Sequence, residues 1–108
     1  MVENVIAEIT HVDYYLPKED YSNKNLTSKT KDQVIIKSII NKVGIDTKFA
    51  AEKKEFSTDM GVEAAKKILD NNPDLRGNID FIIFCTQSPE HIIPSGSSFI
   101  QKSLFPDR

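Results

Sequence analysis

The stretch that decides the fold is Ile79-Asp80-Phe81-Ile82-Ile83-Phe84-Cys85, an almost continuous apolar run between Asn78 and the turn residues Thr86-Gln87-Ser88-Pro89. Short apolar runs bounded by turn residues are typical of β-strands that helices cover on both faces. The run therefore predicts a buried strand in a layered α/β protein.

Cys85, the one cysteine of the chain, closes this predicted strand. A nucleophilic cysteine needs a lowered pKa, which a helix N-terminus or a neighbouring cation supplies. A polar loop follows Cys85 directly, so we expect a buried packing residue, with a nucleophile as the alternative. A single cysteine also excludes an intramolecular disulfide and a Cys-rich zinc site, which favours a reducing compartment.

Three helices are predicted, over residues 30–44, 57–71 and 95–106, because apolar residues recur at helical spacing in each range. Their start signals are the capping-box pair Thr30 and Gln33, then Ser57 or Thr58, and then Ser95, and their stop signals are Gly44, Asn71-Asn72-Pro73 and Pro106. The expected inward faces are Ile35, Ile36, Ile39, Ile40 and Val43; Gly61, Ala64, Ala65, Ile68 and Leu69; and Phe99, Ile100 and Leu104.

Two further extended segments are predicted. Residues 2–12 alternate polar residues with Val2, Val5, Ile6, Ile9 and Val12, which favours a strand, and after Pro17 a polar loop follows as far as Lys29. Residues 45–51 predict a short extended piece. The order of strand, helix, short strand, helix, strand, helix indicates an α/β architecture whose sheet is incomplete in this chain.

Composition and charge limit the class of protein. The 108 residues fit one domain, and 14 Lys and Arg against 16 Asp and Glu give a formal charge of −2. The charges are spread along the chain rather than clustered, which argues against a nucleic-acid partner. Because no secretory leader begins the chain and no run approaches the roughly 20 apolar residues of a membrane span, we expect a soluble cytoplasmic protein.

Residue chemistry alone does not name a reaction. His11 and His91 have no Cys, His or carboxylate partner at the spacing of metal ligands, so no metal site is expected. The four glycines form neither a dinucleotide-binding pattern nor a P-loop.

Four stretches, taken in chain order with nearly ungapped spacing, match the motifs of one enzyme family. The first is Tyr15-Leu16-Pro17-Lys18, with Asn23 or Asn25 in the loop after it, for a "Y-L-P" turn, and the second is residues 42–50 for "R-T-G-I-x-x-R". The third is Ser57-Thr58-Asp59-Met60-Gly61 with Ala64-Ala65 and Ile68-Leu69 for "T-S-D-L-A … A-A … A-L". The fourth is residues 80–89, then Ile93-Pro94-Ser95 and Gln101-Lys102, for "D-x-I-I-x-A-T-x-T-P … P-S … V-Q-x". Together they resemble the N-terminal part of the thiolase-like condensing enzymes, specifically the 3-oxoacyl-[acyl-carrier-protein] synthase III family.

The resemblance implies a thiolase-like layered α-β-α fold and a decarboxylating Claisen condensation. In this family a cysteine thiolate takes an acyl group from a thioester, and a His/Asn pair polarises the malonyl-carrier thioester. The motif of that cysteine is expected just beyond Leu104-Phe105-Pro106, and Cys85 aligns with a small strand residue. Residues 1–108 are therefore expected to be the N-terminal part of a condensing-enzyme domain, truncated before the catalytic cysteine, without a catalytic residue and inactive alone.

The resemblance also implies the molecules that the whole enzyme meets. The substrate would be acyl-coenzyme A or an acyl-carrier thioester, with no permanently bound cofactor. The partners would be acyl carrier protein and a second copy of the enzyme in a homodimer, without nucleic acid or membrane. Ile93 is implied to reach across the dimer interface into the partner's acyl pocket, with a loop anchor on its own subunit as the alternative.

Two positions implied to contact coenzyme A depart from the family pattern. Ser38 stands where the family has a tryptophan that stacks on the adenine. Lys42 replaces the arginine of "R-T-G-I", which keeps the charge but loses the planar fork for bidentate phosphate contacts. A relative that takes its acyl group from a carrier protein or another thioester fits this pattern.

Two other functions stay open. One is a free-standing, non-catalytic α/β interaction module that descends from such an enzyme. The other is a relative of hydroxymethylglutaryl-CoA synthase. An open reading frame that continues past Arg108 into an Ala-Cys motif would support the enzyme, and a stop codon there would support the module.

Overall fold

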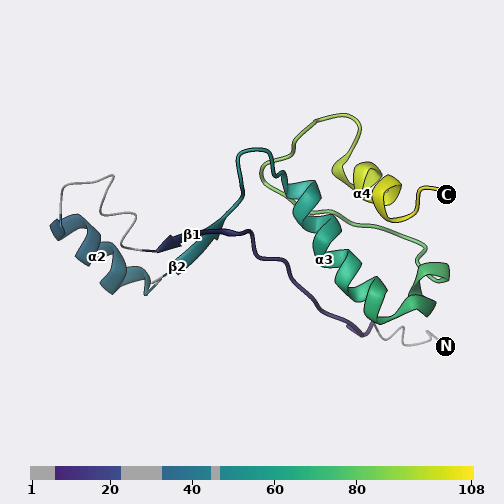
Figure 1. The fold of residues 1–108 in the computed structure, drawn as a ribbon, viewed down its shortest axis with the longest axis horizontal. Coiled ribbons are helices and arrows are strands. Elements are labelled where there is room, and N and C mark those ends of the chain that lie inside the picture. Colours follow the sequence, from purple (N-terminus) through teal and green to yellow (C-terminus); the bar gives the residue numbers. More distant parts are fainter. Residues whose placement is uncertain (1–6, 23–32, 45–46) are drawn as a thin grey trace, which may run out of the picture. The chain divides into compact units, whose positions relative to one another are not determined.

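The computed structural model describes residues 7–22, 33–44 and 47–108. In chain order the elements are β1 (Glu19–Ser22), α2 (Gln33–Val43), β2 (Thr47–Ala50), α3 (Ser57–Asn71), the 3-10 helix η1 (Pro73–Gly77) and α4 (Gly96–Leu104) (Figure 1). The chain divides into two units, one made of residues 1–15 and 57–108 and the other of residues 16–56. 

The core of the first unit lies between α3 and α4. Along α3, Thr58, Val62, Ala65 and Leu69 are three or four residues apart and therefore share one face. The core consists of the buried side chains Val62, Leu69, Ile100 and Leu104, with Ala65, Leu75, Ile82, Phe84 and Phe105 packed around them. Burial of each large apolar side chain contributes about 1.5–3 kcal/mol, so the two helices hold each other through a small number of residues.

The predicted inward faces of these two helices are confirmed in part. Leu69 on α3 and both Ile100 and Leu104 on α4 are buried, whereas Phe99 is only partly buried. The prediction missed Val62 and Thr58, which are 8% and 5% exposed. The buried stripe thus begins one turn earlier on α3 than the apolar pattern indicated, because its first member is a threonine.

The aromatic ring of Phe84 lies between two glycines, one on each helix. A β-carbon added to Gly61 of α3 would lie 3.2 Å from Phe84 Cε2, and one added to Gly96 of α4 would lie 2.7 Å from Phe84 Cδ1 and 2.9 Å from Cε1. Apart from atoms of their own and neighbouring residues, β-carbons in real structures essentially never lie within 3.0 Å of a heavy atom. Position 96 therefore accepts only glycine as long as the Phe84 ring keeps its place.

The segment 79–86 that carries Phe84 forms no hydrogen-bonded strand, so the strand prediction is wrong for the chain as described. Its side chains nevertheless alternate as in extended backbone, because Ile82 and Phe84 pack on the core whereas Phe81 and Ile83 are 80% and 84% exposed. The helices cover one face of the segment and not two. A strand ladder needs a neighbouring strand, and the described residues supply none here.

Cys85 is exposed, which corrects the expectation of a buried packing residue. It lies two residues after Ile83 and four after Phe81, on the same uncovered face of the extended segment. The prediction rested on the apolar character of its neighbours. They do not bury Cys85, because no segment within the described ranges covers that face.

Residues 7–17 also lack a strand ladder, so the predicted strand over residues 2–12 is wrong in its described part. Ile9 and Val12 are each 83% exposed, and Val2, Val5 and Ile6 lie outside the described residues. Lys67 of α3 holds the end of this segment. Its Nζ donates a hydrogen bond to the Tyr14 carbonyl oxygen at 2.7 Å and lies 5.3 Å from the centre of the Tyr14 ring.

The second unit contains α2 and the pair of strands β1 and β2. The two strands run antiparallel, with Glu19 opposite Ala50 and Ser22 opposite Thr47. β2 confirms the extended piece predicted near residues 45–51, although Ile45 and Asp46 lie outside the described residues. β1 contradicts the predicted loop. Its polar residues have no alternating apolar pattern, and the ladder with β2 supplies its backbone hydrogen bonds.

The first predicted helix is confirmed as α2, which begins at Gln33 and ends at Val43. Gly44 follows with φ at 67°, the left-handed conformation that was predicted, and its N–H donates to the Ile40 carbonyl oxygen at 2.8 Å. Of the predicted apolar face, Ile35 is half exposed and Ile40 is partly buried. The capping residue Thr30 lies outside the described residues.

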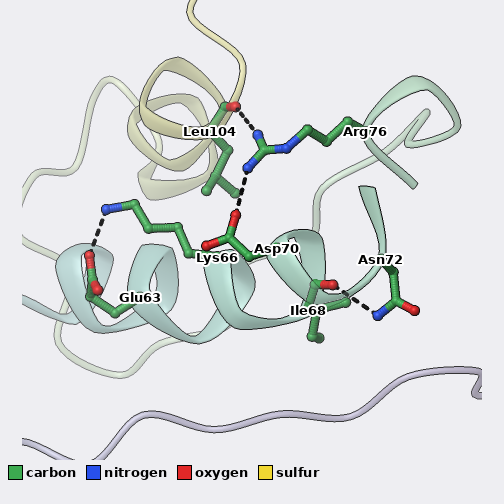
Figure 2. A network of polar contacts seen from close by, with 7 residues as sticks. All are labelled: Glu63, Lys66, Ile68, Asp70, Asn72, Arg76 and Leu104. Carbon is green, nitrogen blue, oxygen red and sulfur yellow. Dashed lines mark hydrogen bonds and ion pairs between the residues drawn. The ribbon is translucent and has the colours of Figure 1, made fainter. Parts of the chain in front are cut away.

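Polar contacts close the C-terminal ends of α3 and α4 (Figure 2). Asn72 Nδ2 donates to the Ile68 carbonyl oxygen at 2.9 Å, so the predicted stop of α3 is confirmed. Arg76, on η1, donates through Nη1 to the Leu104 carbonyl oxygen at 3.3 Å and through Nη2 to Asp70 Oδ1 at 3.1 Å. Because the last carbonyls of a helix have no partner within it, Arg76 both closes α4 and ties it to α3.

The start of α4 differs in detail from the prediction. Ser95 occupies the N-cap position with extended backbone, as predicted, but its hydroxyl makes no capping hydrogen bond. The hydroxyl lies 2.8 Å from Ser97 Oγ and 3.1 Å from Ser98 Oγ. The Ser98 N–H donates a hydrogen bond to the Ser95 carbonyl oxygen at 3.0 Å, and this bond forms the first turn of α4.

We expect Gly96→Ala to lower the free energy of unfolding of the 108-residue chain, because the new β-carbon overlaps the Phe84 ring and either the ring or α4 must move. Overpacking of this kind costs about 1–3 kcal/mol. Gly77→Ala is the matched control, since a β-carbon there meets no atom within 4 Å. Urea denaturation followed by circular dichroism measures both variants, and equal midpoints would contradict the placement of Phe84.

Candidate functional site

The candidate site is the loop of residues 86–95, which connects the extended segment to α4 and is hereafter the 86–95 loop (Figure 1). Its first half is attached to the first turn of α3. Ser57 Oγ donates to the Ser88 carbonyl oxygen at 3.3 Å, and Thr58 Oγ1 donates to Glu90 Oε2 at 2.9 Å. The Ser88 N–H donates to Thr86 Oγ1 at 3.2 Å, which folds the loop back on itself.

Thr58 is the one buried polar residue within the described ranges, and Glu90 satisfies its hydroxyl. The Glu90 carboxylate thereby lies beside the N-terminal turn of α3, where the helix dipole and the free N–H groups favour an anion. Its other oxygen, Oε1, lies 3.5 Å from His91 Nε2, a contact that becomes an ion pair when His91 is protonated. The His91 ring in turn lies 5.4 Å from the ring of Phe99 on α4.

The tip of the 86–95 loop carries two uncovered apolar side chains. Ile92 is 89% exposed and Ile93 is 86% exposed, and the peptide bond from Ile93 to Pro94 is cis. The residues on both sides of the tip are held. Glu90 is held by its hydrogen bond to Thr58, and Gly96 is held by its packing against Phe84. Ile93, the predicted pocket residue, therefore projects from a loop with a fixed base.

The structure places the other two predicted site residues on α2, in the second unit. Ser38 and Lys42 are four residues apart, which puts them one turn apart on the same side of the helix, and both are exposed. Lys42 lies in the last turn, where the negative end of the helix dipole favours a cation. The position of Ser38 offers a hydroxyl and no aromatic face to a ligand.

Sequence reasoning missed Thr58 and Glu90 as site residues. It gave Thr58 a capping role, and 32 residues separate the two partners of the hydrogen bond. The available signal was a hydroxyl at the start of a helix together with a carboxylate in a loop before a second helix. That pattern is common in proteins, so only the structure shows that Thr58 and Glu90 form a hydrogen bond.

The described residues hold no arrangement for nucleophilic or metal chemistry. Cys85 is exposed at the end of the extended segment, and the ranges that the structure describes contain no group of three His, Cys, Asp or Glu side chains placed to hold a metal ion. An apolar hollow of about 280 Å³, lined by Ile68, Leu75, Phe81 and Ile83 among others, adjoins the extended segment and carries no ionisable side chain. None of the helices described combines the length and apolar character that crossing a bilayer requires.

No family model matches the chain. Individual proteins do. The chain is 37% identical over 92 residues to the beta-ketoacyl-[acyl-carrier-protein] synthase III of Ehrlichia canis, an alignment that covers 83% of this chain and 28% of that protein. It is 33% identical over 100 residues to the protein of the same name from Chlamydia muridarum, covering 91% of this chain and 29% of that protein.

A solved structure has a similar fold. The 3-oxoacyl-(acyl-carrier protein) synthase of Burkholderia xenovorans LB400 superposes with a TM-score of 0.77 at 19% identity, over 86% of this chain and 27% of that one. The chain thus spans less than a third of the length of the curated relatives it matches. In sequence and in its incomplete α/β, thiolase-like fold, the chain is related to a segment of the beta-ketoacyl-[acyl-carrier-protein] synthase III family, as its four motifs indicated.

Proposed function

We propose that these 108 residues are the N-terminal segment of an acyltransferase of the synthase III type, here called the parent synthase. The reaction is a decarboxylating Claisen condensation. An acyl group passes from a thioester to a cysteine of the parent synthase, and then to the α-carbon of malonyl carrier protein as carbon dioxide leaves. The observation that carries this proposal is the 37% identity over 92 residues to the Ehrlichia canis synthase.

In this proposal the segment contributes to substrate selection and not to the chemical step. Ile93 at the tip of the 86–95 loop lines the acyl pocket of a second subunit in a homodimer. Its exposure of 86% supports this role, because contact with another subunit would remove a large apolar side chain from water. The chemistry itself belongs to residues outside the segment.

Ser38 and Lys42 are proposed to face the thioester donor. Lys42 is an exposed point charge suited to a phosphate of coenzyme A or of a carrier-bound phosphopantetheine arm. Ser38 supplies no stacking face for an adenine, which only coenzyme A carries. The pair therefore favours acyl carrier protein, or another thioester without adenine, as the acyl donor.

A non-catalytic module that binds another protein is the second candidate. The observation that favours it is the uncovered apolar face of the extended segment, where Phe81 and Ile83 are 80% and 84% exposed. Apolar surface of this kind marks sites of protein association. The two candidates differ in whether the gene that encodes these residues also encodes a condensing activity.

The direct test is a condensation assay with the whole protein encoded by that gene. Purified protein is incubated with malonyl carrier protein and with acyl-coenzyme A or acyl carrier protein as donor. We expect 3-oxoacyl carrier protein and carbon dioxide in equal amounts. Absence of both products with every donor would overturn the proposed enzymatic function and leave the interaction module as the remaining candidate.

We expect Ile93→Phe in the parent synthase to shift its preference toward short acyl primers, because the larger ring fills pocket volume that a longer or branched chain needs. Overpacking costs about 1–3 kcal/mol, and this applies to the longer primers. Ile92→Phe is the matched control, an equally exposed neighbour on the same loop. The measurement is the ratio of kcat/KM values for long and short primers. An unchanged ratio would show that Ile93 does not line the acyl pocket.

We expect Ser38→Trp to tighten coenzyme A binding by about 1 kcal/mol if the ligand's adenine lies beside α2, because the indole supplies a stacking face. Lys37→Trp, about 100° around the same helix, is the control. Isothermal titration calorimetry on the parent synthase measures both. Equal affinity in the two variants, with turnover from acyl-carrier thioesters only, would favour a donor other than coenzyme A.

We expect the 108-residue chain alone to show no condensing activity and no covalent acyl label. Acyl transfer of this type needs a cysteine at a helix N-terminus with His and Asn partners, and the one thiol here, Cys85, ends an extended segment. Incubation with a radiolabelled acyl thioester, followed by denaturing electrophoresis, makes the measurement. Stoichiometric label on Cys85 would contradict the expectation, and a Cys85→Ser chain controls for nonspecific acylation.

A further inference from the structure

The 86–95 loop is joined to α3 by a side-chain hydrogen bond that an exposed loop does not need in order to form. An exposed loop can be held by its chain ends alone, but here a buried hydroxyl and a carboxylate join it to a helix 32 positions earlier in the chain. Thr58 is 5% exposed and the Glu90 side chain is 21% exposed, so water competes little for this hydrogen bond. Hydrogen bonds to a charged acceptor are about twice as strong as those between neutral groups.

Glu90 lies two and three residues before the isoleucines of the tip. A peptide chain spans at most about 3.6 Å per residue, so fixing the Glu90 side chain restricts Ile92 and Ile93 to a small region. Gly96, three residues after Ile93, is restricted in the same way by the ring of Phe84. The tip is thus a short bridge between two fixed points, and the Thr58 hydrogen bond provides one of them.

We infer that Glu90, through its hydrogen bond to Thr58, is a positioning residue that sets how far Ile93 projects and thereby which acyl chains the parent synthase accepts. This inference rests on the proposed function, because it gives the tip a role in substrate selection. Glu90 touches neither substrate nor reacting atoms in this account. It acts on selectivity through the place of the loop and leaves the chemical step alone.

The test measures acyl-chain selectivity in the parent synthase with Thr58→Val, Thr58→Ser and Glu90→Ala. Valine has nearly the shape of threonine but cannot donate, whereas serine keeps the hydroxyl. The quantity measured is the kcat/KM for a branched primer divided by that for an acetyl primer. We expect Thr58→Val and Glu90→Ala each to move this ratio toward one by roughly tenfold, which is at the lower end of the discrimination that apolar pockets achieve between substrates. The kcat for the acetyl primer should stay within roughly twofold, and Thr58→Ser should retain the original ratio.

Two controls separate positioning from a general structural effect. Glu63→Ala removes a carboxylate from the exposed side of α3, where it pairs with Lys66 at 2.7 Å, and should leave the ratio unchanged. The double variant of Thr58→Val and Glu90→Ala should shift the ratio no further than either single change, because both remove the same hydrogen bond. Shifts that multiply in the double variant would overturn the inference.

Failure of the inference and failure of the proposed function give different results. If Ile93→Phe changes the primer ratio while Glu90→Ala and Thr58→Val do not, the inference is overturned and the proposed function stands. If the unmodified parent synthase forms no condensation product, the proposed function is overturned and the inference falls with it. Glu90 lies in a loop and outside the apolar core, so the result of Glu90→Ala decides the matter even where Thr58→Val fails to fold.

Discussion

The first unit depends on the packing of one aromatic ring between two helices. Phe84 contacts α3 where Gly61 leaves room for it and α4 where Gly96 does. A β-carbon added at Gly96 would lie 2.7 Å from the ring, so no larger residue fits while the ring keeps its place. Interiors are packed densely enough that such a contact fixes the elements on either side. The same ring thereby sets the position of the extended segment and of the end of the 86–95 loop.

The features proposed to have a function follow from that arrangement. Because Phe84 and Ile82 face the core, their neighbours Phe81, Ile83 and Cys85 face outward, and the residues that the structure describes supply no cover for them. The loop that follows returns to α3 through Glu90 and leaves Ile93 exposed. A segment that spans less than a third of its relatives would present surfaces of this kind wherever the rest of a larger fold meets it.

Local signals were sufficient to predict α2, α3 and α4, whose start residues, stop residues and apolar spacing all lie within a few neighbouring residues, but they did not predict the 3-10 helix η1. They predicted β2 but failed for the other strands, because a ladder needs a partner. The apolar segment 79–86 has no partner among the described residues, whereas polar β1 has one in β2. In the site, Ile93 was named through motif resemblance, and its role stays a proposal. The contact of Thr58 with Glu90 joins residues 32 positions apart, which no local pattern encodes.

We propose that the extended segment becomes a sheet strand in the whole parent synthase, where residues outside this chain supply its partners. Amide hydrogen exchange of residues 79–86, measured in the 108-residue chain and in the whole protein, tests it most directly. We expect rapid exchange in the isolated chain and exchange slowed by at least about a hundredfold in the whole protein, since the amides of paired strands exchange only when the strands open by local or global unfolding. Equally rapid exchange in both would contradict it.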